Sequence, residues 1–244
     1  MTEEEKSRYE LIFSRHAGEY HELVAAEDWE GNLPRALGEI TSFAGRTVVE
    51  LGAGTGRVTM IVAPLCAKVL AFDRSQHMLD TAAANMRDVG NVSLAVCDNR
   101  AVPLPDASAD IVIEGWSFGH TVSQAKSQWQ NQADELLAEC NRLLKPGGVL
   151  IIIETLGTGF RMPAPPGAVL PLFYGYLEKQ LGFTARWVRT DYRFPSLAET
   201  RRLVEMFFGA MVDYDLVEGR QVIVPECTGL WWKSRPRAKE RNQG

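Results

Sequence analysis

The chain has 244 residues, of which 45% are hydrophobic and 23% charged, and its formal net charge at pH 7 is −5. Its length accommodates one large domain with a sizeable buried core, and its composition is that of a soluble globular protein. The negative balance of charge argues against nucleic acid as the default partner, because neutralising phosphates requires a basic surface.

Residues 1–44 are predicted to form two or three helices ahead of the first strand. Apolar side chains cluster at Tyr9–Phe13 and again at Leu23–Ala25. Pro34 suits the first turn of a further helix, because its fixed φ is helical and its missing N–H is not needed there.

The next stretch, VVELGAGTGR, joins a short apolar run to three glycines at alternate positions. Val48–Leu51 is predicted to be a buried parallel strand, and Gly52, Gly54 and Gly56 form the tight turn into a helix. Glycine in such a turn adopts positive φ and lets the backbone approach a ligand closely. The geometry is typical of nucleotide sites, which lie beyond the carboxyl ends of strands in doubly wound sheets.

Spacing separates two kinds of nucleotide site. A dinucleotide fingerprint that began at Gly52 would place its third glycine at position 57, where this chain has Arg57. An NAD(P)-binding oxidoreductase is therefore an alternative that lacks one required glycine. The pattern E-x-G-x-G-x-G, with Glu50 as its acid, resembles motif I of the class I S-adenosylmethionine (AdoMet) methyltransferases.

Acidic residues follow the next two predicted strands. Lys68–Phe72 reads as a buried strand, and Asp73 stands at its carboxyl end, 17 residues after Gly56. That separation of one helix and one turn brings the carboxylate beside the glycine turn, where it can accept two hydrogen bonds from a ribose diol. Val92–Val96 is a third strand, and Asp98-Asn99 follows it.

The resemblance continues through a fourth and a fifth strand. Asp110–Gly115 is a predicted strand, and Trp116–His120 is the predicted loop at its carboxyl end. A helix over Asp134–Leu144 stops at Lys-Pro-Gly-Gly before the strand Val149–Ile153. The strings LPDASADIVIEGW and LLKPGGVLIIIE resemble the matching segments of the family. Strands that alternate with helices predict an α/β fold with a parallel sheet.

The last third of the chain departs from this alternation. Residues 156–209 contain predicted helices at Leu170–Leu181 and Leu197–Phe208, with a strand-like stretch between them. Met211–Glu218 and Gln221–Trp232 alternate apolar and polar residues and are predicted to form an antiparallel hairpin.

The resemblance implies a doubly wound, mostly parallel seven-stranded sheet in the order 3-2-1-4-5-7-6, which that hairpin would close. It also implies three segments along the chain. Residues 1–44 would be an N-terminal helical cap, and 45–232 the AdoMet-binding domain with a lid insert at about 156–209. Residues 233–244 are polar and basic, and they are expected to be a disordered tail.

The resemblance also implies AdoMet as cofactor, S-adenosyl-L-homocysteine (AdoHcy) as its product, and no metal. By position, the cofactor-binding residues would be Glu50, Gly52, Gly54, Gly56, Asp73, Met78, Asp98, Asn99 and Trp116. Glu50 would bind the methionine portion or order the glycine turn, and Asp98 would accept from the adenine amino group. Met78 would pack against adenine, although a core methionine explains it equally well.

The implied reaction is methyl transfer to a nucleophile by in-line displacement. His120 is the histidine of the fourth-strand loop, and a near-neutral pKa suits a general base. Four aromatic residues are candidates for the acceptor site: Tyr20, Tyr174, Trp187 and Tyr192. A small-molecule acceptor is favoured, with protein or RNA as alternatives. A non-catalytic AdoMet-binding partner or sensor domain would carry the same cofactor motifs. The methylated atom and the oligomeric state do not follow from the sequence.

Three absences bear on the compartment. The acidic start MTEEEKSRYE lacks the pattern of a signal peptide. No run approaches the roughly 18 apolar residues of a membrane span. The four cysteines are scattered, with no C-x-x-C pair. We therefore expect a cytoplasmic enzyme with reduced cysteines, no membrane partner and no zinc site.

Overall fold

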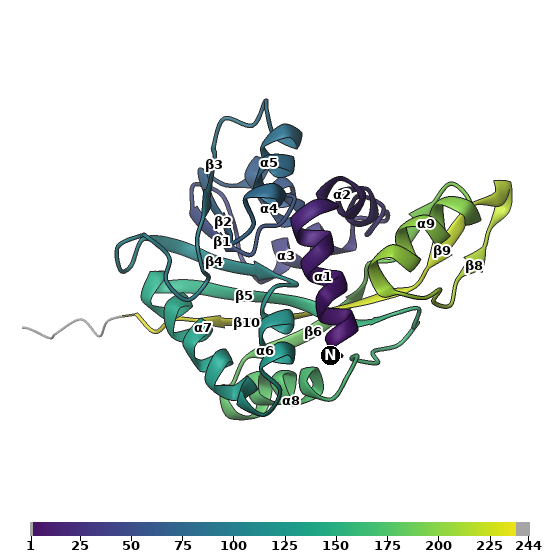
Figure 1. The fold of residues 1–244 in the computed structure, drawn as a ribbon. Helices are drawn as coiled ribbons and strands as arrows, with labels where there is room; N and C mark the ends of the chain where they lie inside the picture. The colour runs from purple at the N-terminus through teal and green to yellow at the C-terminus, as the bar shows by residue number, and fades with distance from the viewer. Residues whose placement is uncertain (1, 238–244) are drawn as a thin grey trace, which may run out of the picture.

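The computed structural model describes residues 2–237 and has a central seven-stranded sheet with helices on both faces (Figure 1). In spatial order its strands are β3 (Val92–Val96), β2 (Lys68–Asp73), β1 (Thr47–Leu51), β4 (Ala109–Gly115), β5 (Leu144–Thr158), β10 (Glu226–Ser234) and β6 (Thr184–Arg189). Neighbouring strands are parallel from β3 to β5, and β10 is antiparallel to both β5 and β6. The predicted fold class and strand order are thereby confirmed, with β10 in the position of the predicted strand 7, between β5 and β6.

The remaining elements are helices and a small second sheet. The α-helices are α1 (Glu3–Arg15), α2 (Ala17–Ala25), α3 (Asn32–Ile40), α4 (Arg57–Val62), α5 (Gln76–Asn85), α6 (Phe118–Ala125), α7 (Trp129–Leu143), α8 (Val169–Gly175) and α9 (Leu197–Phe208). The short helical turns are η1 (Ala63–Leu65), η2 (Lys126–Gln128), η3 (Tyr176–Gln180, a π-helix) and η4 (Glu218–Arg220). The second sheet has three strands, in the order β7 (Tyr192–Phe194), β9 (Val222–Val224) and β8 (Asp215–Leu216).

Two apolar layers enclose the main sheet. Helices α6, α7 and α8 cover one face with side chains such as Leu136 and Phe173, and α3, α4 and α5 cover the other. Because both faces are covered, successive residues of β4 from Ile111 to Ile113 are fully buried. This burial explains why the strand reads as a continuous apolar run.

The predicted hairpin does not close the main sheet. The first arm contains β8, which pairs with β9 in the second sheet. The second arm divides into β9 and β10, and β10 lies in the main sheet between β5 and β6, the outer strand from the predicted insert. Val222 and Val224 pack in a separate cluster with Leu203, whereas Leu230 joins the core of the main sheet. Pro225 lies between β9 and β10, where its missing N–H interrupts strand pairing.

The predicted lid and cap are likewise divided among different layers. Helix α8 packs on the main sheet, whereas α9 packs on the second sheet, which projects to one side in Figure 1. Helices α1 and α2 contact α5 and α9, whereas α3 packs on the main sheet. The expected domain boundaries stay predictions.

The start of the predicted tail is ordered by the sheet. Strand β10 continues to Ser234, and the Arg235 N–H donates to the Gly148 carbonyl at 2.8 Å. The rest of the predicted tail, residues 238–244, lies outside the described residues.

Candidate functional site

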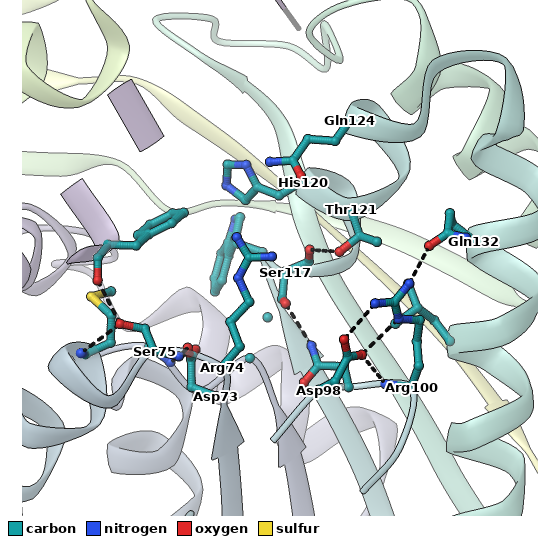
Figure 2. Close-up of a pocket in the computed structure, with 18 of the residues that line it drawn as sticks. Asp73, Arg74, Ser75, Asp98, Arg100, Ser117, His120, Thr121, Gln124 and Gln132 are labelled. Carbon is teal, nitrogen blue, oxygen red and sulfur yellow. Dashed lines mark hydrogen bonds and ion pairs between the residues drawn. The ribbon is translucent and has the colours of Figure 1, made fainter. Parts of the chain in front are cut away.

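A cavity of about 430 Å³ opens at the carboxyl ends of the parallel strands (Figure 2). It lies between the glycine turn, the ends of β2 and β3, and helix α6. Seven of the nine residues predicted to bind the cofactor line it: Gly52, Gly54, Asp73, Met78, Asp98, Asn99 and Trp116. Glu50 and Gly56 are not in the lining.

The glycine turn requires glycine for both conformation and space. Gly52, Gly54 and Gly56 have φ values of 74°, 55° and 91°, in the left-handed region. A Cβ on Gly52 would lie 2.2 Å from the Ser117 Oγ. A Cβ on Gly54 would come within 3.6 Å of the Met78 Cε, in space that now belongs to the cavity.

The Asp73 carboxylate holds this turn in place. Its Oδ2 accepts a hydrogen bond from the Gly54 N–H, and its Oδ1 accepts one from the Ser75 N–H, both at 2.8 Å. Burial raises the pKa of Asp73 from its ordinary value. Each carboxylate oxygen has further acceptor capacity, so both can also receive ligand hydroxyl groups from the cavity. Ser75 in turn donates from its Oγ to the Phe13 carbonyl at 2.7 Å, which fixes α1 beside the site.

The end of β3 contributes a second carboxylate. Asp98 accepts hydrogen bonds from the Arg100 guanidinium, from Nε at 2.9 Å and from Nη2 at 2.6 Å (Figure 2). These hydrogen bonds lower the pKa of Asp98 to about 2, so it is ionised at neutral pH. The neighbouring Asn99 donates to the Ser117 Oγ at 3.0 Å. Asp98 and Asn99 therefore face the cavity with part of their hydrogen-bonding capacity already used.

Glu50 is fully buried behind the turn. Its Oε2 accepts a hydrogen bond from the Thr59 Oγ1 of α4 at 2.5 Å. Burial raises the pKa of Glu50 to about 8. Of the two roles that the resemblance implied, this contact favours ordering of the turn over contact with the cofactor. Gly56 also packs internally, because a Cβ there would lie 2.9 Å from the Met86 Cε.

A second cavity, of about 630 Å³, adjoins the first. Tyr20, Trp116 and His120 line both cavities and so form a shared wall. Much of the remaining lining comes from α1, α2, α9, the end of β5 and the start of β10, segments far apart in sequence. This convergence could not be read from any one motif.

His120 lies on α6 rather than in a loop, because that helix begins at Phe118. Its ring meets the Tyr9 ring edge-on, with centroids 4.7 Å apart. Burial, and then the positive charge of Arg74, lower the pKa of His120 to about 4. Figure 2 shows Arg74 extending toward His120. The near-neutral pKa expected from the sequence is therefore wrong, and the imidazole is uncharged at neutral pH.

The four candidates for the acceptor site separate into two pairs. Tyr20 and Tyr192 line the second cavity. Tyr174 instead donates its hydroxyl to the Thr155 carbonyl at 2.9 Å and stacks on Trp231, with centroids 4.4 Å apart. Trp187 is 40% exposed on β6, the outer strand, and lines neither cavity. Aromatic character alone did not predict whether each side chain would face the cavity, the core or solvent.

Sequence reasoning missed the buried acids of the second cavity. Glu154 and Glu226 line it, and each is 2% exposed. Glu114 is fully buried beside Glu154, and burial together with the charge of Glu154 raises its pKa well above the ordinary value. Glu114 and Glu154 each follow an apolar run (IVIE and IIIE), a signal that could have identified them.

Two features are absent from residues 2–237. No group of three or more His, Cys, Asp or Glu side chains in this range could hold a metal ion. None of its helices combines the length and the apolar character needed to cross a membrane.

Residues 49–152 match a family described as a methyltransferase domain. A malonyl-[acyl-carrier protein] O-methyltransferase of Serratia marcescens is 34% identical over 147 residues, which are 60% of this chain and 52% of that protein. A demethylmenaquinone methyltransferase of Lactococcus lactis is 26% identical over 166 residues, 64% of this chain and 61% of that protein. The chain thus spans about half to three fifths of the length of these relatives. The crystal structure of the YcgJ protein of Bacillus subtilis shares the fold, with a TM-score of 0.54 and 14% identity over 86% of this chain and 100% of that one.

Proposed function

We propose that the chain is a class I AdoMet-dependent methyltransferase that transfers the methyl group of AdoMet to a small-molecule acceptor. The match of residues 49–152 and the order of the main sheet support this proposal. AdoMet occupies the first cavity and the acceptor occupies the second. One observation carries this assignment: Tyr20, Trp116 and His120 line both cavities. Two ligands bound on either side of these three side chains meet at the shared wall, as a direct transfer requires.

The first cavity fits AdoMet in size and in chemistry. Its volume of about 430 Å³ lies within the range of roughly 300–1,000 Å³ that is typical of small-molecule sites. Asp73 binds the ribose diol through its two oxygens, and Met78 packs against the adenine. Asp98 and Asn99 bind the polar edge of the base. Gly52 and Gly54 leave the space that a Cβ would fill.

The cofactor supplies a methyl group already activated by its positively charged sulfur, so the first task of the protein is alignment. Tyr20 and Trp116 lie in the shared wall, where they exclude water and direct the acceptor toward the first cavity. His120 lies in the same wall, and its pKa of about 4 leaves the imidazole uncharged at neutral pH but makes it a weaker base than an ordinary histidine.

The alternatives are less well supported. An NAD(P) site needs glycine at position 57, and Arg57 there is paired with Glu27. A non-catalytic AdoMet-binding domain would have no need of the second cavity of about 630 Å³. The relatives are named for malonyl-carrier and demethylmenaquinone methylation, which supports a small or carrier-bound acceptor over RNA. The four free thiols support a cytoplasmic location.

Titration calorimetry tests the cofactor assignment. AdoMet and AdoHcy are expected to bind the purified protein in a one-to-one ratio, and NADH is not. The protein is then incubated with a metabolite extract and AdoMet that carries a labelled methyl group, and the labelled product is identified. Tight binding of NADH without AdoMet would exclude the proposal. Binding of AdoMet without labelling of any extract component would favour the sensor alternative.

A further inference from the structure

Glu226 presents an unpartnered carboxyl oxygen in the lining of the second cavity. The residue is 2% exposed at the start of β10. Its Oε1 accepts a hydrogen bond from the Thr155 Oγ1 at 2.7 Å, whereas its Oε2 has no hydrogen-bond partner among the described residues. Leaving a buried polar atom unpaired costs free energy, so such an atom in a cavity wall marks a place for a ligand donor.

The charges around Glu226 leave it without a cation of its own. The positive charge of Arg57 lowers the pKa of Glu226, but the Arg57 guanidinium donates to both oxygens of Glu27. One guanidinium thus serves two buried carboxyl groups. Burial, and then the negative charge of Glu27, raise the pKa of Glu226 above its ordinary value. Asp191 accepts a hydrogen bond from the Glu226 N–H at 3.0 Å, and its own charge is paired with Arg189.

The rest of the lining adds another buried carboxyl group, a second arginine and several aromatic rings. The Glu154 Oε1 accepts from the Gly119 N–H at 2.5 Å, and its carboxyl group interacts with that of Glu114. The second cation of the lining, Arg8, lies on α1, where its charge contributes to lowering the pKa of Glu5, and its Nε has no hydrogen-bond partner among the described residues. Aromatic rings line much of the remaining wall, including Tyr9, Trp116, Phe207 and Phe208. Ring faces attract cations, and their area suits an apolar body.

We propose that the acceptor carries a basic amine on an apolar or aromatic body, and that Glu226 binds this amine through its unpartnered oxygen. The inference rests on the proposed function, which makes the second cavity the acceptor site. A protonated amine supplies both a hydrogen-bond donor and the positive charge that the carboxyl groups Glu27 and Glu226 lack between them. A hydroxyl group supplies only the donor, and a carboxylate adds a further negative charge in a buried site.

Three matched probes test the assignment: phenethylamine, 2-phenylethanol and phenylacetate, which share a ring and differ in charge. Each is titrated into protein saturated with AdoHcy. The amine is expected to bind about tenfold or more tightly than the alcohol, as a charge-assisted hydrogen bond predicts, and phenylacetate is expected to bind most weakly. In Glu226→Gln the affinity for the amine should fall to that for the alcohol, whose own affinity stays within about twofold.

Glu39→Gln is the matched control, because Glu39 is exposed and pairs with Arg186 outside both cavities. It should leave all three affinities unchanged. AdoHcy affinity is measured in every variant and checks the first cavity independently. Failure of the wild-type protein to bind AdoHcy would overturn the proposed function itself.

Other outcomes overturn only the amine assignment. They are binding of AdoHcy with equal affinities for amine and alcohol, tighter binding of phenylacetate, or no binding of any probe. The comparison among probes in the wild-type protein decides the matter even if Glu226→Gln fails to fold.

Discussion

The guanidinium carbon of Arg57 lies 3.1 Å from the centroid of the Trp116 ring. The same guanidinium donates to both oxygens of Glu27, and the two side chains are only 16% and 3% exposed. Arg57 therefore connects the start of α4, the segment after α2 and the wall shared by the two cavities. Glycine at this position, which a dinucleotide site needs, would remove the two hydrogen bonds to Glu27 and the contact with the Trp116 ring.

Replacement of Arg57 by alanine is expected to lower the free energy of unfolding by about 3–5 kcal/mol, because Glu27 would be left buried and unpaired. Urea unfolding followed by fluorescence measures the change. The double variant Arg57→Met/Glu27→Gln removes both charges and should recover most of the loss. A double variant no more stable than the single one would show that the unpaired carboxylate is not the cause.

Asp73→Ala is expected to weaken AdoMet binding by about 1.5–3 kcal/mol or more, because the variant loses charged acceptors for the ribose diol and the hydrogen bond that orders Gly54. Calorimetry with AdoHcy measures the effect. Asp80→Ala is the matched control, since Asp80 is exposed on α5 and pairs only with Gln76 among the described hydrogen bonds. Unchanged affinity in Asp73→Ala would remove Asp73 from the site.

Gly52→Ala should both destabilise the protein and abolish AdoHcy binding. Its Cβ would lie 2.2 Å from the Ser117 Oγ, and the φ of 74° strains any residue with a side chain. Adding Ser117→Gly removes the clash but not the strain, which should leave a deficit of about 1–3 kcal/mol. Thermal unfolding of the single and double variants separates the two effects. Gly90→Ala, with nothing within 4 Å of its Cβ, serves as control.

His120 should make stability depend on pH. Its pKa of about 4 in the folded protein is below the ordinary 6.5, so the unfolded chain binds the extra proton between these values. The free energy of unfolding therefore rises from pH 4 to 6.5 on account of this group, by about 3 kcal/mol, and falls on acidification. His120→Gln should flatten that part of the profile. An identical profile in His120→Gln would contradict the lowered pKa.

If His120 accepts the proton of the acceptor, its removal should slow turnover by about 10²–10⁴-fold. His120 lines both cavities, but AdoHcy affinity should change far less than turnover, because the proton comes from the acceptor. Turnover of His120→Ala is compared with that of the wild-type protein across pH 6–9, once an acceptor is known. Equal turnover throughout that range would retire the role.

Tyr174→Phe should cost about 1 kcal/mol of stability, the value of one hydrogen bond, because its hydroxyl donates to the Thr155 carbonyl within the core. Binding of acceptor probes should not change. Chemical unfolding and probe titration measure the two effects separately. A large loss of probe binding at unchanged stability would return Tyr174 to the acceptor site.

The sequence determined the features that depend on local geometry. Alternate glycines after an apolar strand specify a turn with positive φ, and one helix later the chain places Asp73 on the adjacent parallel strand. The repetition of strand and helix likewise predicted a parallel sheet, whereas the order of its strands was implied by the family resemblance. These relations hold because each is fixed within a few tens of residues, by backbone conformation and by right-handed connections.

Only the tertiary structure decided the acceptor side. Its cavity brings together α1, α2, α6, α9, β5 and β10, and no local pattern specifies contacts among segments so far apart. The same reason explains why Tyr174 turned into the core while Tyr192 reached the cavity. Glu226 looked like one residue of an ordinary strand, and its unpartnered oxygen exists only because packing buries it beside Glu27 and Arg57. The sequence gives the type of each residue, but long-range packing decides which residues lie together in a buried site.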